Sequence, residues 1–145
     1  MFDINFKAAK GMFFDRVLIK NKADAATKKR LSKFGAYVRQ TSRQSIRRRK
    51  VSSRPGQPPS SHTGLLKDFI YFGYDENRQS VVIGPVVLAR KASGIPEVLE
   101  YGGNVTIQWG SARGQTVSIE ARPFMGPAFD KEVDRASSLW ANSIK

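Results

Sequence analysis

Residues 52–66, SSRPGQPPSSHTGLL, constrain the fold more than any other stretch of the chain. They contain three prolines, two glycines and five serine or threonine residues. Proline lacks the backbone donor and glycine carries a large entropic cost, so neither a helix nor a central strand is compatible with this stretch. The sequence therefore predicts an irregular joint here, between two segments of different structure.

Charge separates the two sides of this joint. Residues 25–54 contain eleven Lys or Arg and no Asp or Glu, whereas the chain after Leu66 has mixed charge and a strand-like composition. The net charge of +13 and the pI near 10.4 predict a strong positive field. Such a field favours nucleic acid, anionic lipid or acidic protein surfaces, and charge alone does not choose among them.

Length and composition bound the class of protein. A chain of 145 residues with 40% hydrophobic content fits one domain. Cysteine is absent, which excludes a disulfide framework and thiolate sites. No apolar run approaches the roughly 20 residues of a membrane helix, and the segment MFDINFKAAK lacks the apolar region of a signal sequence. We therefore expect a soluble, unsecreted protein that does not contact a membrane.

The basic segment predicts the longest element, a helix from Asp24, a candidate N-cap, to Arg49. The residues of its predicted inner side are spaced three or four positions apart, and they are Leu31, Phe34, Val38, Thr41 and Ser45. Gly35 and Ala36 leave little bulk beside that side, so we expect another backbone to approach there. The opposite side is basic: Lys28, Lys29, Lys33, Arg39, Arg43 and Arg47.

Alternating patterns predict short strands. Phe2, Ile4 and Phe6 alternate with polar residues, which indicates a short N-terminal strand, and the apolar patch at residues 12–19 is expected to pack under the main helix. Residues 69–74 and 80–83 predict one hairpin. Residues 105–109 and 116–121 predict another around the tip GSARG, residues 110–114.

Two further helical segments complete the prediction. Residues 96–100 predict one turn ended by Gly102 and Gly103, and a final helix begins near Pro127 and runs to about Asn142. Its apolar side is expected to consist of Phe129, Val133, Ala136 and Trp140. The order of elements implies an α+β class, with both helices packed on a mostly antiparallel sheet of about four strands. The single domain, 1–145, then comprises an N-terminal arm (1–20), a basic helix (24–50), a Pro/Ser loop (51–64), strands and hairpins (65–121) and a C-terminal helix (123–142).

Catalytic patterns are missing from the sequence. His62 is the only histidine and lies in the Pro/Ser loop, without a nearby carboxylate or second ligand. Glu97, Glu100 and Glu120 are scattered and form no acid and base pair by spacing. There is no Gly-x-Ser-x-Gly elbow and no Gly-Lys-Ser phosphate loop. We therefore expect no enzyme activity, no metal site and no cofactor.

Two kinds of adhesion stay open. The basic helix, with Phe34 and Tyr37 nearby, is suited to clamping phosphates, and an ordinary solvated charged face is the alternative. The aromatic strand with Phe69, Tyr71 and Phe72 is a candidate for edge pairing with a neighbour, and core burial is its alternative.

Four motifs in one order resemble a known family. They are HTGLL (residues 62–66), SVVIGP (80–85), VLEYGG (98–103) and ARPFMGPAF (121–129). Together they resemble the tail-component family of long-tailed bacteriophages, the tail completion or head-tail joining proteins, over residues 31–140. The longer N-terminal arm and the insertion at residues 110–114 depart from the family pattern. The matching positions are Thr63, Gly64, Leu66, Gly84, Pro85, Glu100, Tyr101, Gly102, Arg122, Pro123 and Phe124.

The motifs also make physical sense. Thr63 and Gly64 turn the chain out of the loop, and glycines at the later motifs let it reverse. Arg122 is held extended by the proline that follows it, and we expect its guanidinium to pair with the carboxylate of Glu100.

The resemblance implies a structural protein of the virion neck or tail, present in the host cytoplasm during assembly. It implies a homo-oligomeric, hexameric ring that meets a head connector or adaptor and a tail terminator or tail tube protein, with transient contact to genomic DNA. Expected contacts to DNA or to an acidic partner are Arg39, Arg43, Arg47, Arg48, Arg49 and Lys50. Expected subunit contacts are Phe2, Ile4, Phe6, Pro55, Pro58 and Pro59. The alternatives are a basic nucleic-acid-binding module, and a tail terminator or connector ring.

Overall fold

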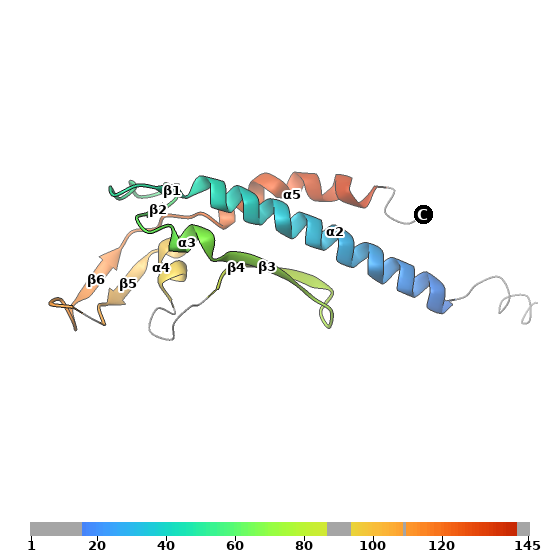
Figure 1. Ribbon diagram of the computed structural model, residues 1–145, viewed down its shortest axis with the longest axis horizontal. Coiled ribbons are helices and arrows are strands. Elements are labelled where there is room, and N and C mark those ends of the chain that lie inside the picture. Colours follow the sequence, from blue (N-terminus) through green and yellow to red (C-terminus); the bar gives the residue numbers. More distant parts are fainter. Residues whose placement is uncertain (1–15, 87–93, 109, 142–145) are drawn as a thin grey trace, which may run out of the picture.

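A long helix runs along most of the molecule (Figure 1). The computed structural model describes residues 16–86, 94–108 and 110–141, and helix α2 spans Arg16–Ser45. The predicted start at Asp24 is wrong, because no proline or glycine interrupts the helical sequence before it. Asp24 lies inside the helix, and its carboxylate accepts a hydrogen bond from Gln79 Nε2 at 2.9 Å. The predicted end at Arg49 is also wrong, since the helix stops at Ser45.

The predicted N-terminal arm is shorter than residues 1–20, because the last five of those positions belong to α2. Leu18 and Ile19 are each 53% exposed, so they do not pack under the main helix as expected. Residues 12–14 of the predicted apolar patch lie outside the described residues, as do Phe2, Ile4 and Phe6.

A hairpin packs against one side of α2. Strands β3 (Ile70–Asp75) and β4 (Ser80–Pro85) are antiparallel, with Phe72 opposite Ile83, which confirms the first predicted hairpin. A Cβ added to Gly35 would lie 2.7 Å from Val81 Cγ2 and 3.0 Å from Phe72 Cδ2. The close approach predicted at Gly35 is therefore real, but side chains of the hairpin make it rather than another backbone.

Helix α5 (Gly126–Trp140) packs beside α2 (Figure 1). Phe34, Val38 and Ala128 form the buried centre of this contact, and the Phe34 and Phe129 rings meet edge to face with centroids 5.6 Å apart. The predicted apolar side of α5 is confirmed at Ala136, which packs against this cluster, and is wrong by about one residue at the other three positions. Ala128 and Glu132 face inward, because a small side chain permits close approach and the Glu132 carboxylate is hydrogen-bonded by Thr41 Oγ1 at 2.7 Å. The larger predicted side chains are half exposed: Phe129 45%, Val133 41% and Trp140 40%.

A second core cluster lies where α2 ends. It consists of Ile46, Ile70 and Phe124, with Leu66 and Leu99 packed against it. Around it lie β1 (Arg47–Arg48), which pairs in parallel with β2 (Ser60–Ser61), and the short helices α3 (Leu65–Asp68) and α4 (Ile95–Tyr101). As predicted, α4 ends at Gly102.

The last hairpin, β5 (Gly103–Thr106) and β6 (Thr116–Ile119), stands at the end of the molecule away from the first turn of α2 (Figure 1). The α+β class is confirmed. The described strands pair two by two, however, instead of forming one sheet of about four strands. Among the described residues, no helix is long and apolar enough to span a membrane.

Candidate functional site

Two of the four motifs, VLEYGG and ARPFMGPAF, meet at the start of α5. We call this site the motif junction and define it by Ser53, Glu100, Gly102, Arg122 and Phe124. These residues come from the Pro/Ser loop, from the end of α4 and from the linker between β6 and α5. The junction is therefore assembled from parts of the chain that are far apart in sequence.

Glu100 caps α5 from outside that helix. Its Oε2 accepts hydrogen bonds from the backbone N–H groups of Phe124 and Met125 at 2.9 and 3.0 Å, and its Oε1 accepts one from Gly126 at 2.7 Å. The first N–H groups of a helix have no partner within it, and α5 has no side-chain cap of its own at Met125. The carboxylate also lies at the positive end of the helix dipole. Glu100 thus fixes α4 to the first turn of α5.

Arg122 does not pair with Glu100, and that expectation is wrong. Its Nε donates to the Ser53 carbonyl at 3.2 Å and its Nη1 donates to the Glu120 carbonyl at 3.0 Å. The carboxylate of Glu100 is already used by three backbone donors, so the guanidinium instead holds two backbone segments together.

The Pro/Ser loop is consequently docked on the linker before α5. Besides the Arg122 contact, the Gly56 N–H donates to the Ala121 carbonyl at 2.8 Å. Ser53 is 6% exposed and Pro59 is buried, whereas Pro55 is exposed. Residues 52–59 are irregular as predicted, but the predicted joint is too long, because Ser60–Ser61 form β2 and α3 begins at Leu65. Packing on neighbouring segments stabilises these two short elements.

Phe124 and Leu66 anchor the junction in the second core cluster, where Phe124 is 1% exposed. Gly64 precedes α3 with φ at 90°, a conformation that suits glycine, and its N–H donates to Ser61 Oγ. Gly84 and Pro85 pair with the first two residues of β3 at the end of the hairpin. Among the motif positions, Tyr101 is the most exposed large apolar side chain, at 79%. Thr63 is exposed and its Oγ1 accepts from the Leu65 N–H, while Pro123 is half-buried.

Gly102 sets the direction in which the β5–β6 hairpin leaves α4. Its φ is 78°, and an added Cβ would lie 3.1 Å from the Ala121 nitrogen and 3.2 Å from the Ile119 carbonyl oxygen. A side chain would therefore collide with backbone, which cannot move as easily as the end of a flexible side chain.

Arg39 and Arg43, two of the six predicted basic contacts, bind elements that pack against α2. Arg39 Nε donates to the Ile70 carbonyl at 2.7 Å, and its guanidinium lies 5.6 Å from the centroid of the Tyr71 ring. Arg43 pairs with Asp68 at 3.3 Å. Both arginines thus attach α2 to the elements packed on it, and their roles toward an outside partner stay predictions.

The other four predicted basic contacts are exposed. Together with Arg54 we call them the basic loop: Arg47, Arg48, Arg49, Lys50 and Arg54. Arg49 donates to Ser60 Oγ, and no basic-loop residue forms an ion pair with a carboxylate in the described part of the chain. The basic loop therefore presents uncompensated positive charge at the end of α2.

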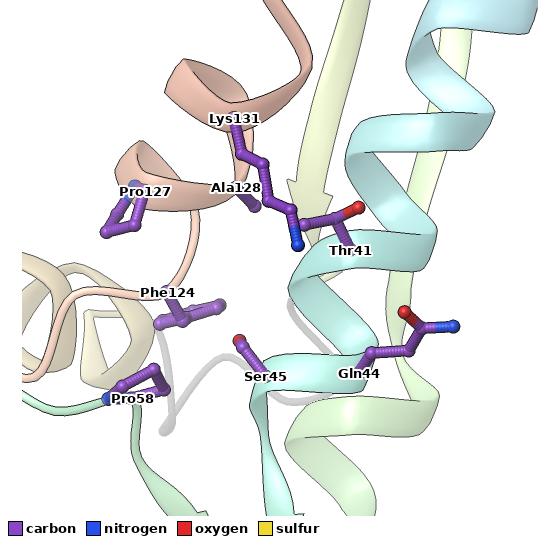
Figure 2. A pocket seen from close by; sticks show the side chains of 8 residues that line it. All are labelled: Thr41, Gln44, Ser45, Pro58, Phe124, Pro127, Ala128 and Lys131. Carbon is purple, nitrogen blue, oxygen red and sulfur yellow. The ribbon is translucent and has the colours of Figure 1, made fainter.

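A cavity of about 300 Å³ opens between the end of α2, the Pro/Ser loop and the start of α5 (Figure 2). Pro58, Phe124 and Ala128 contribute apolar surface, and Lys131 extends across its upper part. Pro58 also lines a neighbouring, more polar cavity of about 400 Å³ beside Arg47 and Arg49. Of the three prolines expected at subunit contacts, Pro58 is the one placed at these openings.

The residues that sequence reasoning considered for catalysis or metal binding lie apart from one another, or already have partners, where the structure describes them. His62 is exposed, and no group of three acidic, histidine or cysteine side chains is placed to hold a metal ion within ranges 16–86, 94–108 and 110–141. Sequence reasoning missed the capping role of Glu100 and the docking of Ser53, because both are long-range contacts to backbone that leave no local pattern. Comparisons of the chain with protein-family models, with curated proteins and with solved structures find no match.

Proposed function

We propose that this chain is a structural subunit of the head-tail junction of a tailed bacteriophage. It forms a ring, hexameric by resemblance, that completes the tail and joins it to the head connector, with a channel for DNA. Its partners are copies of itself, a connector or adaptor, and a tail terminator or tube protein. It acts in the virion and assembles in the host cytoplasm, and the role needs no catalysis.

The observation that carries this proposal is the motif junction. The sequence resemblance consists of separate short motifs, and three of them supply residues to one region: Leu66 packs against the core cluster that contains Phe124, and Glu100 caps the helix that follows Phe124. Residues from unrelated short matches would have no reason to meet in space. Their meeting supports a common structural role for the motifs.

Exposed apolar side chains support the assembly part of the proposal. Val82 is 66% exposed on the outer face of β4, and α5 carries the half-exposed Phe129, Val133 and Trp140. Exposed apolar side chains that gather on one side of an element, as those of α5 do, mark candidate interaction sites. A subunit that functions only within a ring has a use for such surfaces.

The test is the particle mass of the purified protein, measured by light scattering over a wide concentration range, with electron micrographs of the particles. The proposal predicts discrete closed rings with a central opening and a mass that is a whole multiple of 16.2 kDa. A single species of 16.2 kDa at every concentration, with no ring on addition of DNA, would contradict it.

The basic loop favours a second candidate function, a nucleic-acid-binding module. Five exposed cations within eight positions can neutralise phosphates, and each neutralised phosphate contributes about 0.9 to the slope of log affinity against log salt. The test is a salt titration with duplex and single-stranded DNA. Micromolar binding at physiological salt that Arg47→Glu, Arg48→Glu and Arg49→Glu together abolish would favour this candidate. The matched control reverses Lys20, Lys22 and Lys29, exposed cations on α2.

A further inference from the structure

We infer that the β5–β6 hairpin of one subunit docks onto the exposed side of α5 in a second copy of this chain. This inference deepens the proposed ring and rests on it. It names the two surfaces that form the contact between subunits. We call the receiving surface the apolar stripe and define it by Phe129, Val133 and Trp140.

The β5–β6 hairpin has two chemically different faces. Val105 lies opposite Val117 and Gly103 opposite Ile119 on one face, whereas Thr106 lies opposite Thr116 on the other. The pairing continues beyond the strands, since the Ile107 N–H donates to the Gln115 carbonyl at 2.9 Å. One face is therefore apolar, as in a strand pair that rests on a core.

Neither of the two buried clusters in the described part of the chain includes a residue of this hairpin, and Val105 and Ile119 are only partly buried. Helix α4 is the described element that packs against it most, and it does so at the start of β5. Val117 is 44% exposed. A lone two-stranded hairpin is at best marginally stable in water, so an apolar face without cover gains stability from a partner.

The apolar stripe has the geometry of a receiving surface. Along α5, Val133 comes four positions after Phe129, and Trp140 comes seven positions after Val133. This spacing places all three on one side of the helix. They are 40–45% exposed, although Phe129 also touches Phe34. Asp130 and Asp134 are exposed beside the stripe, and neither forms an ion pair with a described residue.

Charge complementarity selects a second copy as the occupant. Arg113, at the tip of the hairpin, is exposed and without an ion pair in the part of the chain that is described. The exposed Asp130 and Asp134 are therefore suitable partners for it in a protein whose net charge is +13. In the proposed contact, the apolar face of the hairpin packs against the apolar stripe, and Arg113 pairs with Asp130 and Asp134 of the second copy.

The geometry makes this contact intermolecular. The hairpin leaves the motif junction in one direction and α5 leaves it in the other (Figure 1). Arg122 holds the base of the hairpin, because its Nη1 donates to the Glu120 carbonyl and its backbone N–H donates to the Leu99 carbonyl of α4. The two surfaces differ and lie on different parts of the subunit, so their contact is heterologous, and repeated heterologous contacts close into rings or extend as filaments.

The test uses one variant in each surface. Val117→Asp in the hairpin and Val133→Asp in the stripe are each expected to reduce the particle mass from that of the ring to 16.2 kDa. Circular dichroism and the melting temperature should stay close to those of the wild type, since both side chains are exposed. The matched controls are Ser118→Asp on the polar face of the hairpin and Ser138→Asp on the other side of α5, and both should keep the ring.

Mixing the two variants separates this interface from a symmetric one. The Val117→Asp subunit keeps an intact stripe and the Val133→Asp subunit keeps an intact hairpin, so a mixture should form heterodimers and stop there. A charge exchange gives a second readout: Arg113→Asp should weaken assembly, and Asp130→Arg with Asp134→Arg should restore it.

If both single variants still form rings of the wild-type mass, or if their mixture forms no heterodimer, this inference is overturned. The proposed ring itself would then still stand. A wild-type protein that stays monomeric at every concentration would overturn both.

Discussion

The Oε1 atom of Glu100 lies 2.7 Å from the backbone nitrogen of Gly126, the first residue of α5. A side chain from one helix thus completes the hydrogen bonds of another that begins 26 positions later in the chain. Because the same carboxylate also accepts from Phe124 and Met125, its loss would leave three donors without partners. Glu100 is therefore the residue on which the motif junction depends most.

Glu100→Ala should lower the free energy of unfolding by about 2 kcal/mol, the upper end of the cost of removing a helix cap. Glu100→Gln should cost about half of that, because an amide oxygen still accepts but carries no charge for the helix dipole. Urea denaturation measures both. The matched control is Glu97→Ala on the exposed side of the same helix, where a change within about 0.5 kcal/mol is expected. Equal effects at the two positions would contradict the capping role.

Gly102→Ala should destabilise the protein more than Gly110→Ala. Both glycines have φ at 78°, but Gly102 also has ψ at 172°, a backbone region that is essentially confined to glycine and costs another residue about 1–3 kcal/mol. An added Cβ also meets the Ala121 nitrogen at 3.1 Å at Gly102, whereas nothing lies within 4 Å at Gly110. The difference between the two melting temperatures measures the combined cost of this conformation and this contact. Identical values would contradict the prediction.

Gly35→Ala should be destabilising although alanine is the better helix former. The helix gains about 1 kcal/mol from the exchange, but overpacking costs about 1–3 kcal/mol. The added Cβ would lie 2.7 Å from Val81 Cγ2, in a side chain held by the hairpin and the core. A double-mutant cycle with Val81→Ala tests this reason, because the smaller side chain removes the clash. Costs that simply add would contradict it.

The pair of Lys28 and Glu76 joins α2 to the tip of the first hairpin and makes stability depend on pH. Their hydrogen bond, and then their Coulomb attraction, lowers the pKa of Glu76 below 4.5 and raises the pKa of Lys28 above 10.5. The stabilisation from Glu76 is present above pH 4.5 and is lost as the pH falls through its folded pKa. The contribution of Lys28 is lost as the pH rises through its own folded pKa.

Glu76→Gln should therefore lower the melting temperature slightly at pH 7 and by less at pH 3, and the effect is small because both side chains are exposed and solvent screens the pair. Scanning calorimetry at the two values checks this. Glu97→Gln serves as the control. An equal loss at both values would assign the effect to packing instead of charge.

Local patterns predicted the local parts of the fold. The β3–β4 hairpin followed from aromatic and β-branched residues on both sides of a polar turn, and the end of α4 followed from Gly102. The side of α5 that faces α2 did not follow. Periodicity gives greatest weight to Phe129 and Trp140, whereas packing selected Ala128 for its size and Glu132 for its hydrogen bond to Thr41.

The sequence predicted which residues belong to the candidate site, but it did not predict which groups their side chains contact. The motif residues Glu100, Arg122 and Phe124 do meet, but the expected ion pair is replaced by contacts of both charges to backbone. Sequence gives the complementary charges of two residues. It does not show which backbone groups lack partners, and those groups decide where the charges go.

The neighbouring positions of Glu100 and Gly102 bear on how a ring would respond to force. One fixes the first turn of α5 and the other fixes the base of the β5–β6 hairpin, so the two proposed contact surfaces of a subunit share one support. Tension that arrives through α5 would pass directly into the hairpin and on to the next copy. The load path would then run around the ring through the motif junctions.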